Sequence, residues 1–257
     1  MPDDILHLSI YCLTAVIAAA CNSVAGGGTF FTFPTLLFYG MPAIQANATS
    51  TAALWPGTLA SAYAYREDAV KHKDKMPRLI TISLIGGTAG AITLLYTTEQ
   101  TFRELIPWLL LTATVLFAIS PKVTDFLHRI TKDNSRYQKT GTLGSTLMQL
   151  GIAFYGGYFG AGIGILMLAM LGLMGMRDIH EMNGLKTILG SAINATAVAL
   201  FIFMGVIVWK IAIVMMVGGM IGGYWGARIA KHVPRPLIRG IVIATGSILT
   251  VIFFINN

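Results

Sequence analysis

Ten apolar segments, separated by short polar stretches, account for most of the chain. A helix of about 20 apolar residues is long enough to span the hydrocarbon core of a bilayer. The pattern therefore predicts an all-α polytopic membrane protein with eight to ten crossings. The apolar segments lie at residues 5–24, 29–40, 48–65, 79–96, 105–121, 142–157, 163–175, 184–205, 209–229 and 236–255.

Two of these segments are too short and too broken for an ordinary crossing. Residues 29–40 follow three glycines and are interrupted by Pro34, and residues 163–175 follow Gly160 and Gly162. A polar cluster comes after each of them. Short, glycine-interrupted segments at matching places in two halves of a chain indicate the binding site of a transporter.

The order of features repeats along the chain. In each half the order is glycines, a short apolar run, a Gly-Met pair, and then an Asn and a Thr. The Asn and Thr are Asn47 and Thr51 in the first half and Asn183 and Thr187 in the second. Later in each half comes a helix with closely spaced glycines, which allow helix backbones to approach in lipid. We therefore expect two inverted repeats of about five helical segments each. The predicted parts are a first repeat at residues 1–121, a cytoplasmic linker at 122–141 and a second repeat at 142–257.

Composition agrees with a membrane protein. The 257 residues are 55% hydrophobic and 11% charged, whereas soluble proteins carry about 25% charged residues. The formal net charge is +7, but the Lys and Arg residues lie in short loops, as the positive-inside rule describes. Because no nucleic-acid-binding motif accompanies them, we expect the lipid bilayer and not nucleic acid as the partner of this charge.

The basic residues also predict a topology. If all ten segments cross and the N-terminus lies outside, 16 of the 18 Lys and Arg residues lie inside. If residues 29–40 and 163–175 re-enter instead of crossing, the basic loop at 228–239 moves outside, which the positive-inside rule disfavours. We therefore expect both termini outside and full crossings, although half-helices with irregular backbone fit the short segments where protein covers them.

The polar groups within the segments are hydroxyls and amides. None of the eleven acidic residues lies in mid-segment, so the chain lacks the acidic relay of many ion-coupled carriers. Amide and hydroxyl donors, backbone N–H groups freed by glycine, and helix N-termini all suit an anion. Asn47 and Asn183 each precede a long apolar run and are expected to cap it, directing a helix dipole toward the repeat interface.

Lys186 is the one basic residue that the pattern places inside a segment rather than at its clear edge. It is interpreted as a fixed positive charge for an anionic substrate, and the alternative is a lysine that snorkels to the cytoplasmic interface. For the other candidates the alternative is helix capping and packing. The predicted substrate-binding residues are Gly27, Gly28, Thr29, Asn47, Thr49, Ser50, Gly162, Asn183, Lys186 and Thr187. No motif of a membrane enzyme, a metal site or a cofactor site is present, so we expect no enzyme activity, metal or cofactor.

Several of these motifs resemble those of the TauE/SafE family, also called the toluene sulfonate uptake permease (TSUP) or sulfite exporter family. The resemblance covers essentially the whole chain. It rests on Ala25-Gly-Gly-Gly-Thr29 with Pro34, Asn47-Ala-Thr-Ser50, the glycines of 156–164, Asn183-Gly-Leu-Lys-Thr187 and the paired glycines of the later helices. It implies a bacterial inner-membrane permease, built as a duplicated helical bundle, that moves sulfite, an organosulfonate or another small anion. The second copy of the motif lacks the Pro and the Thr-Ser pair of the first and carries Lys186-Thr187 instead.

Three functions remain open at this stage. The first is transport of a small anion, such as a sulfur oxyanion, by alternating access at the repeat interface. The second is an anion channel or uniporter lined by the same donors, and the third is a membrane subunit that assists a partner enzyme. The glycine-rich faces can pack within one chain or between two copies, so a homo-oligomer is also left open.

Overall fold

A computed structural model describes residues 5–24, 26–72, 74, 76–133, 142–176, 178–229 and 235–256. At residues 24, 72, 120–133, 142, 235–239 and 256 it describes the backbone alone. Every regular element within these residues is a helix, which confirms the all-α class. The helices are α1 (Ile5–Val24), α2 (Thr29–Phe38), α3 (Ala43–Ala64), α4 (Arg66–Ala69), the 3-10 turn η1 (Val70–His72), α5 (Met76–Tyr96), α6 (Glu99–Asp133), α7 (Thr142–Tyr158), α8 (Ile163–Leu173), α9 (Ile179–Phe203), α10 (Trp209–Ile229) and α11 (Arg235–Asn256).

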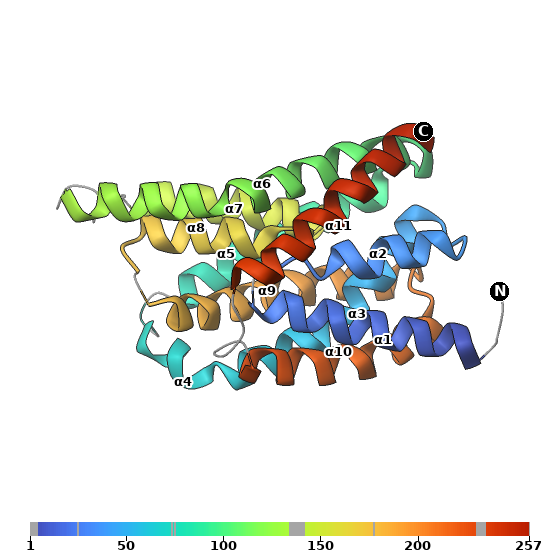
Figure 1. Cartoon of the computed structure of the whole chain (residues 1–257), viewed down its shortest axis with the longest axis horizontal. Helices are drawn as coiled ribbons and strands as arrows, with labels where there is room; N and C mark the ends of the chain where they lie inside the picture. The colour runs from blue at the N-terminus through green and yellow to red at the C-terminus, as the bar shows by residue number, and fades with distance from the viewer. Residues whose placement is uncertain are drawn as a thin grey trace.

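Each half opens with a helical hairpin whose second arm is short. Helix α2 has 10 residues and α8 has 11, so each is about 15 Å long, half the thickness of the hydrocarbon core. Each short helix begins near the middle of the bundle (Figure 1). Residues 29–40 and 163–175 are therefore broken, re-entrant segments, and the expectation that they cross completely is wrong because neither helix is long enough.

The hairpin of each half packs against a glycine-rich helix of the other half. Helix α1 lies along α10, and α7 lies along α5. Glycine brings the backbones together in both pairs: a Cβ on Gly222 would overlap the Val16 carbonyl group, and one on Gly90 would overlap that of Phe154. This confirms the close helix approach predicted from the glycine spacing.

The same two helices use their adjacent glycines to contact the long helix that follows each hairpin. Gly223 of α10 lies against Gly57 of α3, and Gly87 of α5 lies against Ile193 of α9. Helix α10 is thus held between α1 and α3, as α5 is held between α7 and α9. Each half supplies the other with an equivalent set of contacts.

Five helices are long and apolar enough to cross a membrane, judged over the described residues by length and composition. They are Ile5–Ser23, Met76–Tyr96, Glu99–Ile119, Ile179–Phe203 and Trp209–Ile229. Helix α3 has 22 residues but carries Asn47, Thr49 and Ser50, all of which are buried against neighbouring helices. It crosses α9 near the middle of both helices, where the Trp55 indole N–H donates to the Ser191 carbonyl oxygen at 3.1 Å.

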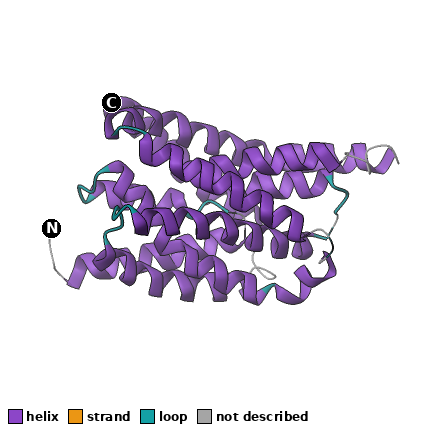
Figure 2. Cartoon of the chain, turned by 180° about the vertical axis from the view of Figure 1, so that it is seen from behind, coloured by secondary structure: helices purple, strands orange, loops and turns teal. Residues whose placement is uncertain are grey.

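The two ends of the bundle differ in charge. Both termini lie at one end, and α4 lies at the other (Figures 1 and 2). Helix α3 ends and α9 begins at the α4 end, and the described basic residues there include Arg66 and Lys71. Helix α6 continues past the predicted end of its apolar run, from Pro121 to Asp133, so the first part of the predicted linker is helical.

Candidate functional site

The two breaks between the hairpin arms meet inside the bundle. We call residues 26–28 the first break and residues 159–162 the second break. A Cβ built on Gly26 would lie 3.1 Å from the Cα atom of Gly164, so the first break touches the first turn of α8. Positive φ angles, which favour glycine, occur in both breaks, at Gly26, Gly27, Gly160 and Gly162.

Helix α6 supplies a common wall for both breaks. The Phe117 ring lies beside Gly27 and beside Gly162, and a Cβ at Gly27 would meet the ring at 2.7 Å. Phe117 also makes an edge-to-face contact with Phe30 of α2, with ring centroids 5.8 Å apart. The structure therefore brings three of the predicted site glycines, Gly27, Gly28 and Gly162, to one region.

Two short helices start at these breaks without side-chain caps. Gly28 is the N-cap of α2 and Gly162 is the N-cap of α8, and neither glycine has a side chain that can cap the N–H groups of its helix. Thr29 is the first residue of α2. The first N–H groups of a helix lack intrahelical acceptors and carry about half a positive charge. An anion at the breaks would be favoured by both helix starts.

The first arms of the hairpins end at the same breaks, and the opposite half holds each of these ends. Lys186 of α9 is 4% exposed, and its ammonium group donates to the carbonyl oxygens of Asn22 at 3.3 Å and Ser23 at 3.2 Å. Asn47 of α3 donates from Nδ2 to the Tyr158 carbonyl oxygen at 3.0 Å. The last carbonyls of α1 and α7 thus face a cation and an amide, respectively.

The snorkelling interpretation of Lys186 is not what the structure shows, because the ammonium group is buried against the end of α1. Its positive charge lies close to the first break, as the sequence interpretation requires. The charge also faces the negative end of the α1 dipole, where cations are favoured. Lys186 therefore holds the hairpin tip in addition to any contact with a substrate.

The prediction that Asn47 and Asn183 cap the long helices is wrong. Helix α3 begins at Ala43, where the Glu99 carboxylate accepts hydrogen bonds from the N–H groups of Ala43 and Ile44. Helix α9 begins at Ile179, and its N-cap is Asp178. Both asparagines therefore lie inside their helices. The helix N-termini at the repeat interface are those of α2 and α8 instead.

The hydroxyl groups of the predicted site have separate partners. The Ser50 and Thr32 hydroxyls form a buried hydrogen bond of 2.6 Å, which joins α3 to α2. The Thr49 hydroxyl accepts from the N–H of Val208, in the connection before α10, so this residue is directed away from the breaks. The Thr187 hydroxyl donates to backbone carbonyls of its own helix, at Asn183 and Gly184.

Several buried polar atoms near the motif have no hydrogen-bond partner among the described residues. They include Asn47 Oδ1, Asn183 Oδ1, Ser191 Oγ and Tyr155 Oη. Buried polar atoms are nearly always paired with protein or with water. The two asparagine oxygens occupy the same place in the two copies of the motif.

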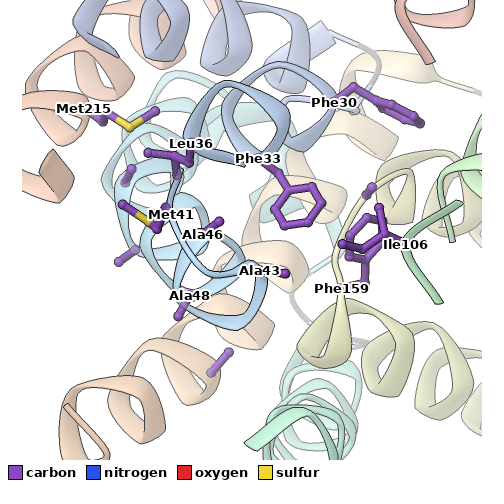
Figure 3. Close-up of a cluster of buried hydrophobic side chains, with 14 of the residues drawn as sticks. Phe30, Phe33, Leu36, Met41, Ala43, Ala46, Ala48, Ile106, Phe159 and Met215 are labelled. Atoms are coloured by element: carbon purple, nitrogen blue, oxygen red, sulfur yellow. The ribbon is translucent and has the colours of Figure 1, made fainter. Parts of the chain in front are cut away.

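An aromatic cluster fixes the first hairpin against the second break. The Phe33 ring of α2 contacts the Phe159 ring edge to face, with centroids 5.5 Å apart, and also lies near Phe102. Figure 3 shows Phe33, Phe159 and Ile106 of α6 gathered in this core.

Phe117 and Glu99 were missed from the sequence because their roles depend on contacts between distant segments.

Acidic side chains that the structure describes lie at helix ends. Glu99 caps α3, and Glu181 pairs with Lys71 at 3.0 Å. Hydrogen bonds from the N–H groups of His180 and Glu181 lower the pKa of Asp178 below its usual value. No group of three or more His, Cys, Asp or Glu residues suited to a metal ion occurs in the described part of the chain.

Comparison with known proteins identifies the family. The family model described as "Sulfite exporter TauE/SafE" matches residues 11–253. The chain belongs to the TauE/SafE family. A "Probable membrane transporter protein" of Haemophilus influenzae is 29% identical over 245 residues, covering 95% of this chain and 92% of the relative.

Two further relatives of this TauE/SafE protein carry similar names. "Probable membrane transporter protein YfcA" of Escherichia coli K12 is 26% identical over 248 residues, covering 95% of this chain and 88% of the relative. "Probable membrane transporter protein ORF9" of a Sinorhizobium species is 27% identical over 254 residues, covering 98% and 94%. No solved structure matches the chain significantly. The family, the relatives and the apolar helices together show a multi-pass membrane transporter.

Proposed function

We propose that this TauE/SafE protein transports a small anion, such as sulfite or an organosulfonate, through a site at the two breaks. The observation that carries the proposal is the meeting of two uncapped helix N-termini, those of α2 and α8, inside the bundle. The N–H groups of Phe30 and Phe31 bond back to Gly27 and Gly28, and that of Ile165 bonds back to Gly162. The N–H groups offered to an oxyanion are therefore those of the first helical residues, Thr29 and Ile163. The name of the matching family supports sulfite as the first substrate to test.

The charges around the breaks favour an anion. Each helix N-terminus contributes about half a positive charge. The Lys186 ammonium offsets the C-terminal end of α1, and the neutral Asn47 amide donates to the last carbonyl of α7. With no described carboxylate hydrogen-bonded at the breaks, the local balance is positive. A monoanion or dianion would complete it.

The contact pattern supports an inverted repeat and alternating access. Helices α1, α3 and α5 of the first half correspond to α7, α9 and α10 of the second. With this correspondence the packed pairs match: α1 packs on α10 as α7 packs on α5, and α3 packs on α10 as α9 packs on α5. In the proposed cycle, the hairpins and the glycine-packed helices rearrange around a fixed site at the repeat interface, as in other inverted-repeat carriers.

We further propose an inner-membrane location with both termini outside. The α4 end includes Arg66 and Lys71, and the loops that the sequence predicts to be cytoplasmic hold 16 of the 18 Lys and Arg residues. The positive-inside rule assigns such an end to the cytoplasm. Under this orientation both arms of the first hairpin, α1 and α2, enter from the outside, and both arms of the second, α7 and α8, enter from the cytoplasm. Because each hairpin begins and ends on one side, re-entry of 29–40 and 163–175 does not move the end of α10 outside. The predicted division into repeats at 1–121 and 142–257 belongs to the same proposal.

Flux measurements separate this proposal from its alternatives. Purified protein in liposomes is expected to take up labelled sulfite with saturating kinetics and to show accelerated exchange when unlabelled sulfite is inside. A channel would give flux that does not saturate and no accelerated exchange. A subunit that only assists a partner enzyme would give no flux above that of empty liposomes, which would overturn the proposal.

A further inference from the structure

Helices α1 and α7, the first arms of the two hairpins, have similar backbone at their C-terminal ends but contact different side chains. At the end of α1, the Lys186 ammonium lies against the Asn22 and Ser23 carbonyl oxygens. At the end of α7, the equivalent long helix α3 offers the neutral Asn47. In the motif register, Asn47 corresponds to Asn183, and Ser50 corresponds to Lys186. One helix end thus holds a tethered cation, and the other does not.

The end of α7 has an acceptor that no described group satisfies. Asn47 is 1% exposed. Its Nδ2 atom donates to the Tyr158 carbonyl oxygen, while Oδ1 of the same amide is buried and has no hydrogen-bond partner among the described residues. Since both atoms belong to one amide group, the unpaired oxygen lies beside the end of α7. Rotation of the amide would direct Oδ1 to the position that Nδ2 now occupies.

The residue just past this helix end is loosely packed. A Cβ built on Gly160, just past the end of α7, would have only the Gly156 carbonyl oxygen within 4 Å. At the first break the corresponding position is filled, because Gly26 lies against the backbone of Gly164. The looser packing therefore occurs at the helix end that lacks a lysine.

We propose that a monovalent metal cation of the sodium class binds at the C-terminal end of α7, with Asn47 Oδ1 and the Tyr158 carbonyl oxygen among its ligands. Helix C-terminal ends carry partial negative charge, and half-helix ends with free carbonyls coordinate alkali cations in other transporters. Hard cations prefer neutral and anionic oxygen ligands. The site needs no carboxylate in the membrane, in keeping with the chain's acidic residues lying outside mid-segment.

The comparison with α1 gives this cation a role. Lys186 supplies a permanent positive charge at one hairpin tip, and the bound cation supplies an exchangeable one at the other. Binding of the cation neutralises the end of α7 and holds the second hairpin to α3. Occupancy of the site therefore links the position of the second hairpin to the concentration of the ion on the side to which the site opens.

The test measures thermal unfolding of the purified chain in chloride salts of sodium, potassium and choline at constant ionic strength. No sulfur oxyanion is present, so the outcome is independent of which anion the protein carries. We expect sodium to raise the midpoint temperature saturably relative to choline. Asn47→Ala is expected to abolish the difference, and Gln149→Leu, which removes another buried amide with an unpaired oxygen on α7, is expected to retain it.

Two further variants keep the proposal testable if Asn47→Ala does not fold. Asn47→Asp places a carboxylate at the site and is expected to lower the half-saturating sodium concentration at least tenfold. Ser50→Lys supplies a tethered ammonium, as in the second half, and is expected to remove the sodium dependence. Equal midpoints in sodium and choline for the wild type, or a half-saturating concentration unchanged in Asn47→Asp, would overturn the proposal.

Discussion

The two copies of the polar motif hold the hairpin tips by different means. In the second half, the buried Lys186 ammonium lies against the end of α1. In the first half, the Asn47 amide lies against the end of α7, and Ser50 bonds to Thr32 of α2. The same helical framework therefore carries a fixed charge on one side and neutral hydrogen bonds on the other. The two halves share the backbone breaks but not the chemistry around them.

The cores beside the two short helices differ as well. Around α2 the core is aromatic, with Phe33 in contact with Phe102 and Phe159. Around α8 it is rich in methionine, including the fully buried Met167 and Met170. Aromatic rings pack with specific geometry, whereas methionine adapts its shape to irregular surroundings. We therefore expect the first hairpin to be the more rigid one and the second to carry more of the motion.

The largest expected effect distinguishes these two cores. Phe33→Ala is expected to lower the free energy of unfolding by about 3–5 kcal/mol, the usual cost of truncating a buried Phe. Met167→Ala is expected to cost at least about 1 kcal/mol less, because a flexible methionine core can collapse around the cavity. Denaturant unfolding in detergent measures both. An equal or larger loss for Met167→Ala would contradict the assignment of rigidity to the first half.

Glycine substitutions test whether the exchanged packing is equivalent in the two halves. Gly222→Val and Gly90→Val each place a side chain into a facing backbone, and overpacking of this kind costs about 1–3 kcal/mol or more. Gly151→Val is the matched control, since a Cβ there meets nothing within 4 Å. Thermal unfolding should show similar losses for the first two variants and little change for the control. A loss confined to one half would show that the two interfaces are not equivalent.

The two motif positions themselves should respond unequally. Lys186→Met removes the side-chain donor of the buried Ser23 carbonyl oxygen and one of the two donors of the Asn22 carbonyl oxygen. It is expected to cost about 1–3 kcal/mol. Ser50→Ala removes one neutral hydrogen bond, to Thr32, and is expected to cost about 0.5–1.5 kcal/mol. The measurement is again denaturant unfolding. A larger cost for Ser50→Ala would reverse the comparison between the halves.

The smallest expected effect concerns the start of α9. The pKa of Asp178 is lowered in the folded protein, first by its hydrogen bond from the His180 N–H and next by that from Glu181. Its contribution to stability is therefore complete above the unfolded pKa of about 3.9 and is lost as the pH falls through the lower folded value. The midpoint temperature of thermal unfolding should fall less between pH 5 and pH 3 in Asp178→Ala than in the wild type. The difference should be small, because a helix N-cap contributes about 1 kcal/mol. An identical pH profile for wild type and variant would show that this cap contributes nothing.

The sequence predicted the helical class, the broken segments and the glycine-mediated packing because each is set by local pattern. The length of the apolar runs predicts α5 and α10. The glycines that predict the two breaks have positive φ angles in the structure. The sequence misplaced the starts of α3 and α9 because their first turns are polar and are stabilised by Glu99 and Asp178. The caps depend on side chains whose partners no hydrophobic pattern reveals.

The partners of Lys186 and Asn47 could not be predicted for a related reason. Both side chains reach backbone carbonyls more than 100 positions away in the chain, so neither contact leaves a local signal. What the sequence did indicate was that these residues lie in a repeated motif beside the breaks. The residues of the motif could therefore be identified from the sequence. That each half's motif side chain bonds to the backbone of the other half could not.

Anion binding by the purified protein tests the central claim most directly. Thermal stabilisation would be measured with sulfite, sulfate, thiosulfate and sulfoacetate at fixed sodium concentration, for wild type, Lys186→Gln and the control Lys210→Gln near the start of α10. The account predicts that one of these anions selectively stabilises the wild type and Lys210→Gln. In Lys186→Gln the half-saturating concentration of that anion is expected to be at least tenfold higher. Absence of stabilisation by every anion, or equal stabilisation of all three proteins, would contradict an anion site at the two breaks.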